Sequence, residues 1–175
     1  SGFLLPSIGS SGESGSIISA PYYFNLAKNF DMTITPTNFS GRGLMMEGEF
    51  RHKSDNSSTV LELANLGKDD VFRENRHAYF FRDNRTFIDN LKQKGDSWYG
   101  TQMSSVVNIG GISDLSYFDD FGNTVSRVGR THITRNISLN RIDYGDYGFI
   151  ASSISATDYQ IAKKDLVEQY SVLPR

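Results

Sequence analysis

Short runs in which apolar and polar side chains alternate are the feature that most constrains this chain. From Asp31 to Thr37 and from Leu44 to Arg51, one set of alternate positions is largely apolar and the other largely polar. A period of two places these sets on opposite faces of a β-strand. No run approaches the roughly 18 apolar residues of a membrane-spanning helix. A membrane-spanning strand, however, needs only about ten alternating residues.

Turn residues separate further runs of this kind, and together they predict about nine strands joined mostly by short connections. Bacterial outer-membrane barrels made of one chain close with an even number of antiparallel strands. We therefore expect an all-β fold: an antiparallel β-meander of about nine strands that forms part of a large transmembrane β-barrel. Because Ser1 follows no initiating Met and no signal-peptide pattern is present, we expect an excised or processed segment.

Charged residues predict which face of the sheet meets lipid. A Lys or Arg at the middle of a bilayer costs about 2 to 4 kcal/mol on the lipid face of a barrel, and acidic residues cost somewhat less. Glu47, Glu49 and Arg51 are therefore expected to face the barrel lumen. On the same strand, Leu44, Met46 and Phe50 are then expected to face lipid.

Two prolines interrupt the first two predicted strands. Pro6 and Pro21 lie fifteen positions apart, on strands expected to be hairpin neighbours. Proline has no N–H to donate to a β-ladder, so it occurs at edges, bulges or weak seams. The residues alone allow two interpretations: each proline marks a local bulge, or the pair marks a seam that can open.

The longest predicted connection runs over residues 110–132, which are rich in Gly, Ser and Asp. If the first strand rises from the periplasm, this long loop is extracellular, and the turns near residues 28–29, 55–56, 90–96 and 144–146 are periplasmic. Asp114, Asp119 and Asp120 lack the spacing of an EF-hand, so we expect them to be solvated rather than to bind calcium. The segment from Ile161 to Tyr170 is compatible with a short helix or a loop.

Several functional classes are disfavoured by composition. The chain has 18 basic and 20 acidic residues, and this balance gives no indication of nucleic-acid binding. It has no cysteine, and His52, His77 and His132 show no metal-ligand spacing. Glu47 and Glu49 could form a carboxylate pair, but a wetted wall explains them better. We expect no enzyme activity, no cofactor and no metal.

Four stretches resemble the family of LPS-assembly outer-membrane proteins called LptD, in the same order and at similar spacing. They are residues 1–6, residues 21–36, residues 42–51 and residues 113–123. The closing residues 170–174 are also similar to the beginning of that family's next strand. The resemblance implies that residues 1–175 are the first strands of an LptD-like barrel, whose periplasmic jelly-roll domain and remaining strands lie outside the segment.

The resemblance also implies a function and its partners. LptD proteins receive lipopolysaccharide from a periplasmic bridge of LptA and, plugged by the lipoprotein LptE, deliver it to the outer leaflet of the outer membrane of Gram-negative bacteria. Pro6 and Pro21 resemble prolines of the lateral gate through which the lipid leaves. Glu47, Glu49 and Arg51 would line the route or contact the plug.

Two other classes remain as alternatives. One is a small self-contained outer-membrane barrel of about eight strands, acting as an adhesin or structural anchor. It needs an even strand count and a pairing between the first and last strands. The other is a soluble β-sandwich enzyme or sugar-binding protein, which needs two packed sheets and a convergent polar site.

Overall fold

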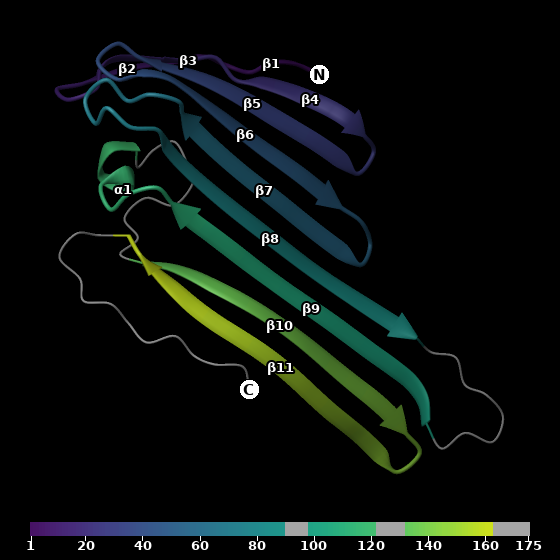
Figure 1. Ribbon diagram of the computed structural model, residues 1–175. Coiled ribbons are helices and arrows are strands. Elements are labelled where there is room, and N and C mark those ends of the chain that lie inside the picture. The colour runs from purple at the N-terminus through teal and green to yellow at the C-terminus, as the bar shows by residue number, and fades with distance from the viewer. Residues whose placement is uncertain (90–97, 122–131, 163–175) are drawn as a thin grey trace.

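The computed structural model describes residues 1–89, 98–121 and 132–162, which form one antiparallel sheet and one short helix (Figure 1). β5 and β6 contain the two alternating runs identified above. The strands are β1 (Gly2–Phe3), β2 (Ser7–Ser11), β3 (Gly15–Ser19), β4 (Tyr22–Ala27), β5 (Phe30–Phe39), β6 (Gly43–Lys53), β7 (Ser57–Leu66), β8 (Arg76–Asp89), β9 (Trp98–Ile112), β10 (His132–Gly145) and β11 (Gly148–Ile161). The helix α1 spans Tyr117–Phe121.

Strands that follow one another along the chain lie side by side in the sheet, whose main path runs β1-β4-β5-β6-β7-β8-β9-β10-β11. β3 and β4 pair with β5 in one continuous register, because Ser19 lies opposite Thr37 and Tyr22 opposite Ile34. β3 and β4 are therefore one interrupted strand, and β1 with β2 is a second. Counted in this way the sheet has nine strands, and the predicted all-β meander is confirmed.

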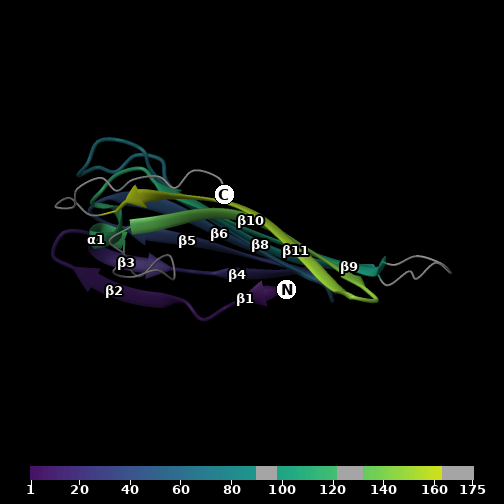
Figure 2. The same ribbon diagram turned by 90° about the horizontal axis from the view of Figure 1, so that it is seen from below.

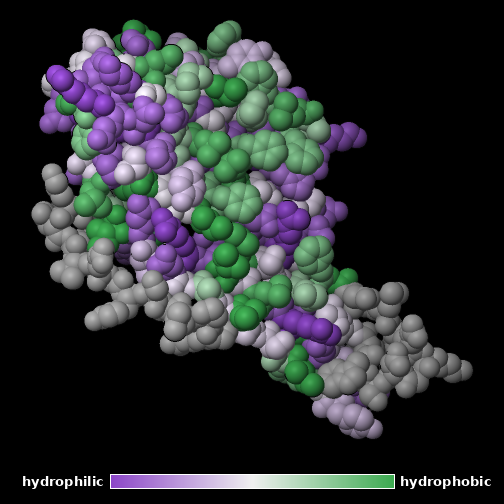
Figure 3. Space-filling model, viewed as in Figure 1, coloured by the Kyte–Doolittle hydropathy of each residue, from purple (hydrophilic) through white to green (hydrophobic). Residues whose placement is uncertain are grey.

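The two faces of the sheet differ in polarity. On the face seen in Figure 3, apolar side chains form a band across the middle of the strands, and hydrophilic residues gather at the end that carries the β7–β8 loop. Leu44, Met46 and Leu63 are among the large apolar side chains left exposed. Glu47, Glu49 and Arg51 alternate with Leu44 and Met46 on β6, and so lie on the opposite face.

The opposite face carries the buried core. Seen from below, β2 and β3 curl round so that α1 lies between them and the rest of the sheet (Figure 2). The Phe121 ring of α1 packs on Phe39 of β5 at 5.5 Å between centroids, and Phe118 stacks on Phe80 of β8 at 6.4 Å. We call this inner side of the curled sheet the concave face.

The described first part of the connection between β9 and β10, residues 113–121, is more ordered than expected. The loop was predicted for residues 110–132, but β9 extends to Ile112 and residues 117–121 form α1. Apolar residues explain the difference, because Tyr117, Phe118 and Phe121 are all buried on the concave face. The rest of the predicted loop, residues 122–131, lies outside the described residues. The same holds for two other sequence expectations, the turn at 90–96 and the segment after Ala162.

Within the described ranges, no helix has the length and apolar character required to cross a membrane.

Gly110 of β9 provides a test of the packing between the sheet and α1. A Cβ atom at this position would lie 2.5 Å from Phe80 Cδ1 and 3.1 Å from Ile133 Cγ2. Phe80 is buried beneath α1 and cannot move aside freely. We expect Gly110→Ala to lower the free energy of unfolding by about 1 to 3 kcal/mol, measured by urea titration.

Gly48→Ala in β6 of the same sheet is the matched control, since nothing lies within 4 Å of a Cβ atom at this position. Equal stability of the two variants would contradict the close packing described for Gly110.

Candidate functional site

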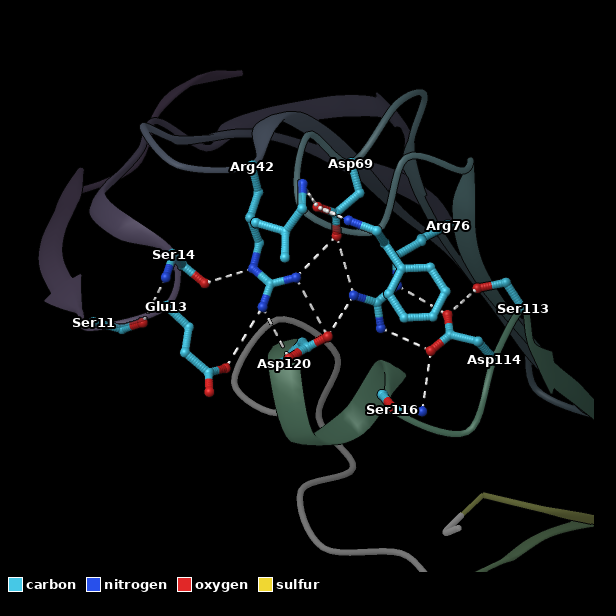
Figure 4. Close-up of polar contacts among 12 residues, drawn as sticks. Ser11, Glu13, Ser14, Arg42, Asp69, Arg76, Ser113, Asp114, Ser116 and Asp120 are labelled. Atoms are coloured by element: carbon cyan, nitrogen blue, oxygen red, sulfur yellow. Dashed lines mark hydrogen bonds and ion pairs between the residues drawn. The ribbon is translucent and has the colours of Figure 1, made fainter.

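Two buried arginines lie at the end of the sheet where the β2–β3, β5–β6, β7–β8 and β9–β10 connections meet (Figure 4). Arg42 lies in the turn between β5 and β6, and Arg76 begins β8. The turn at Arg42 is followed by Gly43, whose φ of +118° is a conformation that side-chain-bearing residues rarely adopt. This turn directs the Arg42 guanidinium toward the concave face.

Arg42 contacts three separate segments of the chain. Its Nε donates to Ser14 Oγ in the β2–β3 turn at 3.0 Å. Its Nη1 donates to Asp69 Oδ2 in the β7–β8 loop at 3.0 Å. Both Nη atoms contact the Asp120 carboxylate of α1, at 3.4 Å and 3.0 Å. One side chain therefore joins two loops and a helix.

Arg76 repeats this arrangement toward the start of the β9–β10 connection. Its Nε and Nη2 donate to the two oxygens of Asp114 at 2.9 Å and 2.8 Å. Its Nη1 contacts Asp69 Oδ2 at 3.1 Å and also Asp120 Oδ2. Paired bonds of this kind fix the orientation of both groups as well as their distance.

Asp69 is the fully buried centre of the cluster. Its Oδ1 accepts the backbone N–H groups of Val71 and Phe72, and its Oδ2 accepts one bond from each arginine. Burial alone would favour the neutral acid. The hydrogen bonds outweigh burial, so the pKa of Asp69 lies below its ordinary value and the group stays ionised.

Aromatic rings close the cluster. The Arg76 guanidinium carbon lies 4.6 Å from the ring centroids of both Phe72 and Phe121, and the Arg42 guanidinium carbon lies 5.5 Å from Phe121. Rings at these distances attract a cation and exclude water. We call Arg42, Asp69, Arg76, Asp114 and Asp120 the ion cluster; it fastens α1 to the end of the sheet.

The sequence did not reveal the ion cluster. We expected Asp114 and Asp120 to be solvated in a loop, but both are largely shielded and bind arginine. Arg42 was included only in the stretch 42–51 that resembles LptD and was given no role of its own. One signal was available in the order of the strands. In a meander every second connection lies at the same end of the sheet, so Arg42 in the β5–β6 turn was bound to lie near the Asp residues of the β7–β8 and β9–β10 connections.

The prolines form a second structural feature, a break across the first two strands. β1 ends at Phe3 and β2 begins at Ser7 around Pro6, while β3 ends at Ser19 and β4 begins at Tyr22 around Pro21. Leu4 N–H donates to the Pro21 carbonyl at 2.9 Å, but Pro21 has no N–H to return. Ladder bonding is therefore reduced where the two interruptions lie side by side.

A third proline extends the break to the next strand. The Ala20 N–H donates to the carbonyl of Pro36 in β5 at 3.2 Å, and Pro36 likewise has no N–H to return. β5 nevertheless continues through Pro36 and keeps ten residue pairs with β6. Strand pairing is therefore weaker on the β1–β2 side of β5, and the break does not continue beyond β5. Sequence analysis identified Pro6 and Pro21 but gave Pro36 no role.

The concave face carries the remaining predicted site residues. Glu47 accepts a hydrogen bond from Thr37 at 3.3 Å. Arg51 lies 2.7 Å from Asp31 and 3.4 Å from Glu49. Glu47 and Glu49 therefore have different partners. All three line one groove with hydroxyl residues of β5 and with the β2–β3 hairpin and α1.

Among the described residues, no group of three or more His, Asp or Glu side chains is arranged to hold a metal ion. His52 Nε2 lies 3.1 Å from the Asn29 side-chain amide, and the His132 ring packs edge-on to Tyr159.

Comparison with known proteins shows one consistent similarity. The chain is 33% identical to the LPS-assembly protein LptD of Azoarcus over 165 residues, which is 94% of the chain and 18% of that protein. It is 31% identical to LptD of Idiomarina loihiensis over 99% of the chain, and 33% identical to LptD of Pseudomonas syringae over all of it. The resemblance to LptD is confirmed.

The chain spans about a fifth of the length of these LptD proteins. No protein-family model matches it. The similarity to LptD covers both structural features described above, because the matched region contains the proline break and the ion cluster.

Replacement of Asp69 tests the ion cluster. Asp69→Asn keeps an acceptor for the two backbone N–H groups but removes the charge shared by Arg42 and Arg76. Removing one partner of a buried ion pair costs about 3 kcal/mol or more. We expect a loss of this size in the free energy of unfolding at pH 7, measured by urea titration of the full-length protein.

The effect should depend on pH. The native pKa of Asp69 lies below its unfolded value of about 3.9, so its ionisation stabilises the native state above that pH. This contribution disappears as the pH falls through the native pKa. The difference between the native protein and Asp69→Asn should therefore narrow below about pH 4. A difference independent of pH would contradict an ionised Asp69.

Proposed function

We propose that this chain is part of an LptD barrel that transports lipopolysaccharide and inserts it into the outer leaflet of the outer membrane. The proline break carries the proposal: two neighbouring strands are interrupted at the same level, and Pro21 cannot return the hydrogen bond that it accepts from Leu4. Each missing ladder bond lowers the cost of separating the strands by about 1 kcal/mol. The first strands would form one side of a lateral gate.

The two faces of the sheet support a place in the membrane. The exposed apolar band suits lipid contact, since Leu44, Met46 and Leu63 would otherwise face water. The end with the ion cluster would be extracellular, and the short turns at the other end periplasmic. The protein would lie in the outer membrane of a Gram-negative bacterium.

The concave face would form the polar wall of the lumen. Glu47, Glu49 and Arg51, with the threonines of β5, offer hydrogen-bonding groups that suit sugar and phosphate better than acyl chains. In the complete protein this wall would face the route of the lipid or the LptE plug. LptA would deliver lipopolysaccharide through a periplasmic domain beyond this segment. No covalent chemistry is involved.

The alternative of a small self-contained barrel finds no support. Its two edge strands, β1 with β2 and β11, have no partner beyond them among the described residues. The relatives are about five times longer than the chain, judging by the share that it covers. A β-sandwich would need a second sheet on the apolar face, and the described strands form one sheet.

Substitution of Pro21 tests the gate. Pro21→Ala supplies an N–H that can donate to the Leu4 carbonyl, completing the bond pair between β1 and the β3–β4 strand. One added ladder bond stabilises the seam by about 1 kcal/mol, which corresponds to roughly a fivefold lower population of the separated form. We expect slower appearance of newly made lipopolysaccharide at the cell surface, measured by pulse labelling.

Pro36→Ala is the matched control, because it also adds one N–H, facing the Ala20 carbonyl, but between the β3–β4 strand and β5 rather than between β1 and the β3–β4 strand. We expect a smaller effect on export from this variant. Unchanged export in Pro21→Ala, with unchanged lipid asymmetry of the outer membrane, would refute the gate.

The lipid-facing and lumen-facing assignments can be tested with one introduced charge. Leu63 is half exposed and pairs with Gly48, which lies on the same side of β6 as Leu44 and Met46. Leu63→Lys should therefore destabilise the membrane-embedded barrel by about 2 kcal/mol. Thr35→Lys is the control, because Thr35 lines the concave groove directly opposite Glu47. We expect near-native stability for Thr35→Lys in urea titrations in lipid vesicles. If Thr35→Lys were the less stable of the two variants, the face with Thr35 would meet lipid and the face with Leu63 would line the lumen.

A further inference from the structure

The β2–β3 hairpin is held to the sheet more weakly than any strand beyond β4. Only Ile17, Ile18 and Ser19 pair with β5, whereas β5 and β6 share ten residue pairs. The proline break separates the hairpin from β1 and β4. Any further restraint on the hairpin has to act at its other end, the turn at residues 12–14.

Contacts at this turn provide that restraint. Gly41 N–H donates to the Ser14 carbonyl at 3.0 Å, and Ser40 N–H donates to the Ser16 carbonyl at 2.9 Å. Arg42 adds the side-chain bond from Nε to Ser14 Oγ at 3.0 Å. Ser14 is buried beneath this contact. The tip of the hairpin is thus fixed to the β5–β6 turn.

Arg42 connects this tip to α1. The guanidinium is planar, so the bidentate contact of its Nη atoms with Asp120 also sets the direction of Nε toward Ser14. Without the Asp120 carboxylate, Asp69 holds only Nη1, and Glu13, which is 81% exposed, approaches Nη2 at 3.6 Å. The side-chain bond from Arg42 to the hairpin tip therefore depends on a carboxylate 106 residues further along the chain than Ser14.

We propose that Arg42 is a latch that couples the seating of α1 on the concave face to the closed position of the β2–β3 hairpin. Displacement of α1 removes Asp120 from Arg42 and releases the Ser14 side chain. The hairpin then keeps its three residue pairs with β5 and the two backbone bonds from Ser40 and Gly41. Phe118 and Phe121 of α1 line the same groove as Ser7 and Ser14 of the hairpin. A molecule in this groove touches both elements that the latch joins. This inference rests on the proposed gate, since the hairpin forms half of the broken strands.

Hydrogen exchange of the full-length protein, read by mass spectrometry, tests the coupling without measuring export. Asp120→Asn removes the charge from the α1 side of the latch and changes no hairpin residue. We expect amide exchange in residues 7–19 to accelerate about tenfold, together with exchange in residues 113–121. Faster exchange in 113–121 with no change in 7–19 would overturn the latch.

Asp114→Asn is the matched control. Asp114 lies at the start of the same connection and contacts Arg76, Ser113 and Ser116, but not Arg42. This variant should accelerate exchange in residues 113–121 and leave residues 7–19 unchanged. If amide exchange in residues 7–19 accelerated as much as in Asp120→Asn, the cause would be a general loss of local stability, and the specific role of Arg42 would be overturned.

If the Asp120→Asn protein does not fold into the membrane, a second variant can still test the latch. Ser14→Ala removes the hairpin end of the latch while the ion cluster stays intact, so exchange should accelerate in residues 7–19 alone. Unchanged exchange there would also overturn the latch. The gate itself is judged separately by export in Pro21→Ala, so failure of the latch and failure of the gate give different results.

Discussion

A buried guanidinium group is unstable unless carboxylates surround it, and this constraint organises one end of the sheet. Arg42 and Arg76 are both buried, and together they engage Asp69, Asp114 and Asp120. The carboxylates come from two connections that are far apart in sequence. Removing charges from water costs several kcal/mol for each ion, so the arrangement is favourable only when every member is in place. Loss of any one member therefore leaves a buried charge without a partner, at a cost of about 3 kcal/mol or more.

The strands could be predicted from the sequence because their signal is local. Alternation along β5 and β6 is repeated over enough residues to define both the strand and its faces, so Glu47 was separated correctly from Met46 on opposite sides of the sheet. The interruptions at Pro6 and Pro21 were also predictable, since a proline excludes a ladder donor wherever it stands. In each case, neighbouring residues decide the outcome.

The ion cluster could not be predicted in the same way because its members share no local pattern. An arginine between two glycines, and aspartates in a polar connection, are both typical of solvated turns. Tyr117, Phe118 and Phe121 distinguish this connection from such turns, since three aromatic residues in five positions seek a buried surface. Weighing those rings against the surrounding Gly, Ser and Asp would have predicted a buried segment in this connection, although not its helical form.

The meander also has a consequence for the order in which this region folds. Each strand pairs with its neighbour in the chain, so hairpins can form one after another with short loop closures. Arg42 is different: its partner Asp120 lies 78 positions downstream, beyond β9. Until β9 is in place, that carboxylate cannot reach Arg42. While the next four strands, β6 to β9, are added, the β2–β3 hairpin is held only by β5 and the turn after it. The Arg42 bond to its tip reaches its final geometry only after α1 has packed against the sheet.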